Sequence, residues 1–146
     1  MNSSIRCVSV FKHIVLFGTL VLSSPVFADM VIIVHRSSSL NSIDNAELGR
    51  LFLGKSSEFS DGTRAKPINQ VPTSDMRQEF DSTILNRNQA QLKSYWSKMM
   101  FSGEGTPPEE LNGDLDVLKK VMEDTSAIGY VDSSAVNGAV KVLKIK

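Results

Sequence analysis

The sequence predicts a single α/β domain, and three patterns indicate this fold class. Short β-branched runs at residues 30–35 and 127–131 have the continuous hydrophobicity of buried strands. Between these runs, apolar residues recur with helical spacing in several segments. Strands that alternate with helices are typical of α/β domains. We therefore expect one three-layer-like domain with a small mixed sheet and four helices.

The first 28 residues have the organisation of a secretory signal peptide. Arg6 and Lys12 precede an apolar run at residues 14–22, and Ala28 closes the segment with a small side chain. The run is shorter than the roughly 20 residues that span a bilayer, so we expect cleavage after Ala28. The mature chain, residues 29–146, is then periplasmic or secreted and has no transmembrane segment. An uncleaved anchor is the alternative.

The composition argues against several functional classes. Cys7 is the only cysteine and lies in the predicted signal peptide, and His35 is the only histidine after that segment. The mature chain can form no disulfide and no thiolate or multi-histidine metal site, so we expect neither a metal nor a cofactor. The 16 basic and 16 acidic residues are scattered, which argues against a nucleic-acid surface. No known catalytic motif is present, and we do not expect an enzyme.

The first strand and the first helix follow from local patterns. Residues 30–35 form the predicted strand, and Ser42 is expected to cap the following helix. Gly54 ends this helix, as glycine commonly does. The helix has one apolar face made by Leu48, Leu51 and Phe52.

Residues 55–65 are rich in polar and turn-forming residues and predict a loop. A short strand is expected at residues 65–70, where Pro67 marks its beginning or a sheet edge. A second helix is predicted to start near Ser74. Its apolar residues recur every four positions at Met76, Phe80 and Ile84.

The third helix has the clearest pattern in the chain. Asn88 and Gln91 form a variant capping box at its start. Its predicted core stripe consists of Leu92, Tyr95, Trp96, Met99 and Met100. A loop at residues 103–108 follows and is long enough to carry function.

A fourth helix is predicted at residues 114–123, with one face formed by Leu115, Leu118 and Met122. Residues 127–131 predict a buried strand. Residues 140–145 alternate between apolar and polar side chains, which indicates a last strand with one wet face and an exposed sheet edge.

Four segments, at residues 47–55, 61–62, 67–68 and 127–131, occur in the order seen in one family. They resemble the phosphate ABC transporter substrate-binding proteins, which have the type II periplasmic-binding-protein fold. Phe59 stands where that family usually has tryptophan. The resemblance spans residues 30–146 and implies one lobe of a two-lobed protein, with the opposite wall of the ligand cleft missing.

The resemblance also implies an anion site at the start of the second predicted helix. In the family, phosphate is held partly by an arginine followed by serine-glycine-threonine at a helix N-terminus, where free N–H groups and the helix dipole favour anions. When the family's following arginine is set on Arg77, its serine falls on Ser74. Gln70 replaces the upstream arginine, and Thr73 offers a substitute hydroxyl. The implied ligand residues are therefore Gln70, Thr73, Ser74 and Arg77.

Two departures from the motif weaken phosphate binding. Asp75 stands at the glycine position and Met76 at the threonine position. A carboxylate in the first helical turn satisfies the dipole itself and repels an incoming anion. Ser74 as an ordinary helix cap, without any ligand, is the alternative explanation.

Two functions stay open on this evidence. The first is an exported solute-binding-protein-like domain that binds phosphate or a related oxyanion for an ABC transporter. The second is a ligand-free envelope interaction module that docks through the loop at residues 103–108 or the last strand. An apolar surface toward the missing lobe would favour a homodimer or an envelope protein partner.

Overall fold

The computed structural model describes residues 29–146, and the predicted signal peptide lies outside this range. The elements along the described chain are β1 (Met30–His35), β2 (Ser42–Ile43), α1 (Asn45–Phe52), β3 (Lys66–Gln70), α2 (Asp75–Thr83), α3 (Gln89–Ser102), β4 (Glu109–Leu111), α4 (Asp114–Glu123), β5 (Ala127–Asp132), the short 3-10 helix η1 (Ser133–Ala135) and β6 (Val140–Ile145). This alternation confirms the α/β class. Within these residues, no helix combines the length and apolar character needed to cross a bilayer.

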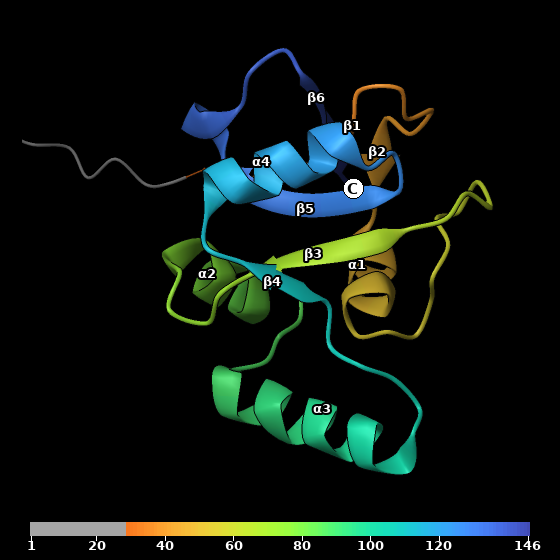
Figure 1. Cartoon of the computed structure of the whole chain (residues 1–146), viewed down its shortest axis with the longest axis vertical. Helices are drawn as coiled ribbons and strands as arrows, with labels where there is room; N and C mark the ends of the chain where they lie inside the picture. The colour runs from red at the N-terminus through yellow and green to blue at the C-terminus, as the bar shows by residue number, and fades with distance from the viewer. Residues whose placement is uncertain (1–28) are drawn as a thin grey trace, which may run out of the picture.

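The strands form one mixed sheet in the order β2-β6-β1-β5-β3-β4 (Figure 1). β1 is antiparallel to both of its neighbours, β5 and β6. The pairs β2–β6, β3–β4 and β3–β5 are parallel. All strands except β1 therefore run in one direction. As a result, the carboxyl ends of β3, β4 and β5 meet at one edge of the sheet.

The core has two layers of side chains, one on each face of the sheet. Alternate residues of β1 point to opposite faces, so Ile32 joins one cluster and Ile33 the other. The first cluster packs under α1 and α2 around three aromatic rings, Phe52, Phe80 and Tyr130. The rings of Phe80 and Tyr130 stack at 4.2 Å between centroids. The second cluster packs under α4, which confirms the expected three-layer arrangement.

The first helix begins later than predicted. Ser42 lies in the two-residue strand β2, and Asp44 is the actual cap of α1, accepting a hydrogen bond from the Glu47 N–H at 2.6 Å. Asp44 is as good a cap as Ser42, so local chemistry did not distinguish the two positions. Gly54 follows the helix with φ of 69°, as expected for a glycine past a helix end.

The predicted inner face of α4 is wrong at two of its three positions. Leu115 is 79% exposed and Met122 is 44% exposed, whereas Leu118 is buried. The helix instead turns Val117 and Val121 toward the sheet. Leu118 lies between two possible apolar faces of the helix, one with Leu115 and Met122 and one with Val117 and Val121. The helix packs the face that carries the two valines against the sheet.

The core stripe predicted for α3 is only partly buried. Its capping box is confirmed, and Leu92 and Trp96 are buried, but Met100 is 51% exposed. In Figure 1, α3 lies beyond the β4 edge and stands apart from the sheet. A helix in that position buries a narrow stripe because no broad sheet face lies beneath it.

The two ends of the sheet also differ from expectation. β4 is a strand of three residues, two of them glutamates, and was not predicted. At the other end, β2 covers part of the outer edge of β6 by pairing with Lys144 and Ile145. The prediction that the last strand forms an exposed edge of the sheet is therefore wrong, because β2 lies outside it.

Candidate functional site

A pocket of about 480 Å³ lies where the carboxyl ends of β3, β4 and β5 meet the first turns of α2 and α4. In Figure 1, this is the left end of strands β3 and β5, where α2 and the start of α4 lie. The pocket is lined by Gln70, Val71, Thr73, Ser74, Asp75, Met76, Asn112, Gly113, Asp114 and Asp132. Three of the four residues implied by the family resemblance, Gln70, Thr73 and Ser74, therefore lie together.

Ser74 is the N-cap of α2, and its hydroxyl oxygen accepts a hydrogen bond from the Arg77 N–H at 3.4 Å. The same hydroxyl donates to Gln70 Oε1 at 2.5 Å. Gln70 Nε2 in turn donates to Asp114 Oδ1 at 2.7 Å and to the Tyr130 carbonyl at 3.1 Å. The Gln70 side chain thus ties the start of α2 to the start of α4.

Arg77, the fourth implied residue, does not line the pocket. It is 5% exposed, and its Nε donates to both carboxylate oxygens of Asp81 at 2.9 and 2.8 Å. Its Nη1 donates to the Gln70 carbonyl at 2.7 Å and to Glu110 Oε1 at 3.1 Å. Two carboxylates already balance the guanidinium, which therefore lies outside the pocket although Arg77 bonds to Ser74 and to the Gln70 carbonyl.

The charged groups lining the pocket are all acidic. Asp75 and Asp114 lie in the first turns of α2 and α4, where the helix dipoles stabilise a carboxylate. Asp132 accepts a hydrogen bond from the Ser134 N–H at 2.8 Å, which lowers the pKa of Asp132 below its usual range. This carboxylate is therefore ionised at neutral pH. Like charges about 4 Å apart repel by about 1 to 4 kcal/mol near a surface, so these groups disfavour a fully ionised anion.

A buried polar network behind the pocket holds the end of β3. The Gln70 N–H donates to the Tyr130 hydroxyl, which donates to Asn69 Oδ1, each at 3.1 Å. Burial is the main cause that raises the pKa of Tyr130, so its hydroxyl stays neutral and able to donate. Tyr130 lies in the segment that carried the family resemblance, but no sequence pattern assigns this role to its hydroxyl.

Sequence reasoning missed the residues that complete the pocket, Asn112 to Asp114 and Asp132. One signal was available, because Asp132 directly follows the predicted strand 127–131. Polar residues at the carboxyl ends of parallel strands commonly line ligand sites. Asn112 to Asp114 carried no such signal because β4 itself was not predicted.

No protein-family model and no curated protein matches this sequence. Solved structures do match its fold. An ABC-type phosphate transport receptor from Vibrio cholerae aligns with a TM-score of 0.63 and 13% identity, over 80% of this chain and 45% of the receptor. A phosphate-bound protein from Clostridium perfringens aligns with a TM-score of 0.64 and 15% identity, over 80% of this chain and 44% of that protein. PstS from Borrelia burgdorferi aligns with a TM-score of 0.61 and 12% identity, over 80% of this chain and 47% of PstS.

These similarities establish the fold. The chain has the α/β architecture of one lobe of these phosphate-transport proteins and spans less than half of the length of each. Identities of 12 to 15% do not extend to the ligand or the activity.

Proposed function

We propose that this chain is an exported solute-binding domain that contacts phosphate or a related small oxyanion for an ABC transport system. The position of the pocket carries the proposal. It lies at the carboxyl ends of parallel strands, where open α/β sheets bind their ligands, in a fold shared with a phosphate-bound structural neighbour. Export rests on the signal-peptide pattern of residues 1–28.

The chemistry of the pocket favours a protonated oxyanion. The first turn of α2 offers backbone N–H groups, and Thr73 and Ser74 offer hydroxyls. The three aspartates offer only acceptors when ionised. Phosphate keeps an O–H donor near neutral pH, which a carboxylate can accept, whereas sulfate has none. We therefore expect a preference for phosphate over sulfate that strengthens as the pH is lowered.

The pocket is one wall of a cleft, and a second wall would come from outside the described residues. One wall with unbalanced carboxylates predicts a weak affinity for the isolated domain, with Kd of about 1 mM. A second copy is a poor source of the second wall. The face around the pocket is acidic rather than apolar, so two copies related by a two-fold axis would bring aspartates together.

Titration calorimetry of phosphate and of sulfate into residues 29–146, freed of carried-over anions, tests this proposal. Thr73→Ala should weaken phosphate binding. Asp75→Asn should strengthen it about fivefold or more by removing one repulsive charge, and should reduce the preference over sulfate. Ser94→Ala, at an exposed position on α3, is the matched control and should change the affinity for neither phosphate nor sulfate. Absence of phosphate binding at millimolar concentration in both the wild type and Asp75→Asn would refute the proposal.

The second candidate is an interaction module without a small ligand. The observation that favours it is the internal pairing of the expected ligand groups, since Ser74 and Gln70 already bond to each other and to Asp114. In that case these hydrogen bonds serve only to hold the starts of α2 and α4 together. Phosphate would then cause neither heat nor thermal shift, and Ser74→Ala would change stability alone, by about 1 kcal/mol for a lost cap.

A further inference from the structure

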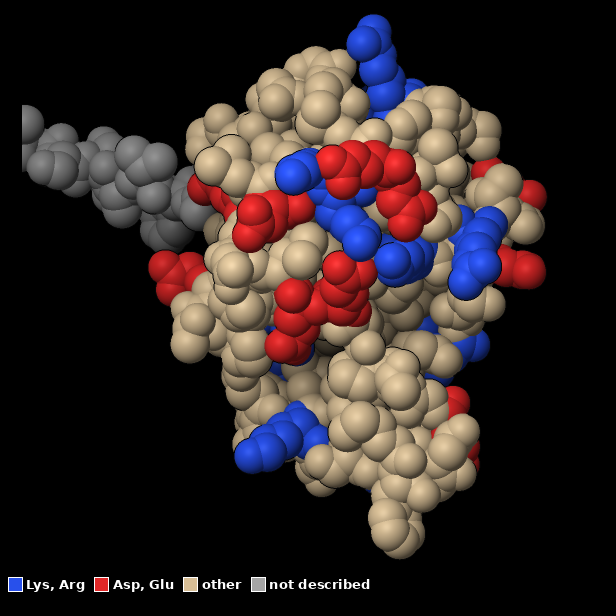
Figure 2. Space-filling model, viewed as in Figure 1, with Lys and Arg blue, Asp and Glu red and all other residues tan. Residues whose placement is uncertain are grey.

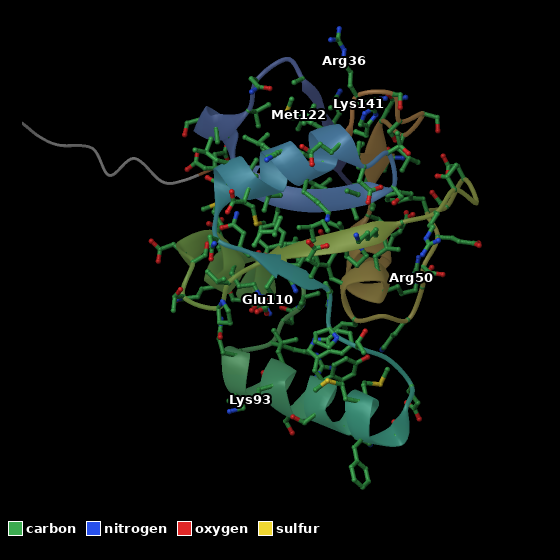
Figure 3. All side chains as sticks on the ribbon, in the orientation of Figure 1. Arg36, Arg50, Lys93, Glu110, Met122 and Lys141 are labelled. Atoms are coloured by element: carbon green, nitrogen blue, oxygen red, sulfur yellow. The ribbon has the colours of Figure 1, made fainter. Side chains whose placement is uncertain are left out.

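The segment around α3 is basic in a chain whose formal net charge is zero. Between Asp81 and Glu104 the sequence contains Arg87, Lys93 and Lys98 and no acidic residue. Neither lysine forms a salt bridge within the part of the chain that the structure describes. Figure 3 shows Lys93 at the side of α3, and Lys93 is exposed although it also borders a pocket with Arg77 and Glu110.

The acidic residues of the neighbouring strand β4 do not neutralise this segment. Glu109 bonds to Lys66 and to Lys120, at 3.3 and 3.1 Å. Glu110 bonds to Arg77 at 3.1 Å. In Figure 2, acidic side chains gather over α4 and β4 beside basic ones, whereas the lower part of the molecule, at α3, is mostly uncharged, with basic atoms at its left side and acidic atoms at its right edge. The positive charge of α3 is therefore available to an external partner.

The outward face of α3 also presents an aromatic ring to solvent. Phe101 is 96% exposed, the highest value among the large apolar side chains of the described chain. Its neighbour Met100 is 51% exposed. At helical spacing from Phe101 lie small or basic residues that are all exposed, Ala90, Ser94, Ser97 and Lys98. Of these, Ala90 and Ser97 also border a pocket that α3 shares with Arg77 and Glu110. A ring flanked by lysines on a projecting helix combines two groups suited to a membrane interface.

We propose that α3 docks on an anionic lipid surface, with Lys93 and Lys98 at the headgroups and Phe101 inserted at the interface. The commitment to lipid rests on charge complementarity together with the single exposed ring. Figure 1 places α3 at the end of the long axis of the molecule. No residue of α3 lines the pocket at the start of α2, so docking leaves that pocket accessible. The proposal does not depend on what the pocket binds.

Vesicle flotation with residues 29–146, which contain both core clusters, tests this inference. The vesicles are equal mixtures of phosphatidylcholine and phosphatidylglycerol, compared with phosphatidylcholine alone at low salt. We expect binding to the anionic vesicles alone, and its loss as salt is raised. Phe101→Ser should lower the partition coefficient about tenfold. Each of Lys93→Gln and Lys98→Gln should lower it about fivefold.

The matched control is Leu115→Ser, which removes another exposed apolar side chain from α4, beside Asp114 and Asp116. It should leave the partition coefficient unchanged. Circular dichroism would verify that each variant is folded, which is expected because the substituted side chains are exposed. The inference is overturned if the wild type does not float with anionic vesicles, or if Phe101→Ser and Leu115→Ser behave alike. It is also overturned if Phe101→Ser abolishes a dimer in sedimentation while vesicle binding is absent, because α3 would then contact a second copy.

Discussion

Replacing Arg77 tests whether this residue supports the fold or holds a ligand. Arg77→Met keeps an unbranched side chain like the aliphatic part of arginine but removes the hydrogen bonds to Asp81, Glu110 and the Gln70 carbonyl. Asp81, which is 1% exposed, then remains as a buried carboxylate without its cation. Breaking a buried pair in this way costs about 3 to 5 kcal/mol. For a domain of this size, that loss lowers Tm by about 10 to 20 °C.

A double-mutant cycle separates the cost of an unpaired charge from the loss of packing. Arg77→Met with Asp81→Leu removes both charges, so the double variant should be more stable than Arg77→Met alone, by about 2 kcal/mol or more. Thermal and urea unfolding can be followed by the fluorescence of Trp96, the only tryptophan. A Tm drop below about 2 °C for Arg77→Met, with no recovery in the double variant, would refute the structural role. Loss of phosphate binding in a fully stable Arg77→Met would return Arg77 to the ligand site.

Three further predictions concern the fold. Gly129→Ala should cost about 1 to 3 kcal/mol in urea unfolding, because an added Cβ would lie 2.5 Å from Val117 Cγ1; a neutral result would mean that the helix shifts freely. Leu115→Ser should change the free energy of unfolding by less than about 0.5 kcal/mol, and a larger loss would contradict its exposed position. The hydrogen bond from Lys120 lowers the pKa of Glu109. This pair should therefore contribute stability that is present above the ordinary glutamate pKa and is lost as the pH falls through the lowered pKa. A Tm difference between wild type and Glu109→Gln that is the same at all acidic pH values would contradict this.

Elements with a complete local signal were predicted well. The capping box of α3 requires only Asn88 and Gln91, and both hydrogen bonds form at 2.9 Å. The cap of α2 at Ser74 and the continuous apolar run of β1 are local in the same sense. In each case the chemistry that fixes the element lies within a few residues of chain, so the sequence alone was sufficient.

Features that depend on distant partners were not predicted. β4 contains Glu109 and Glu110 and forms a strand only because it pairs with β3, about 40 residues earlier in the chain. The destination of the Arg77 guanidinium depends on Glu110 in the same way. The family resemblance implied that both Arg77 and Ser74 are ligand residues, whereas the Ser74 side chain lines the pocket and the Arg77 guanidinium does not.

The strengths of these contacts decide which pocket groups a ligand can recruit. The Ser74–Gln70 hydrogen bond joins two neutral groups, and such a bond contributes about 0.5 to 1.5 kcal/mol net. A ligand that replaces it with hydrogen bonds of its own meets little resistance. Withdrawing Arg77 from Asp81 would instead strand a buried carboxylate at a cost of about 3 to 5 kcal/mol, which a weakly bound oxyanion could not offset. The pocket can therefore offer hydroxyl, amide and backbone donors to a ligand, and it must do so without a guanidinium. A ligand that brings its own proton to the aspartates is the oxyanion best matched to that set of groups.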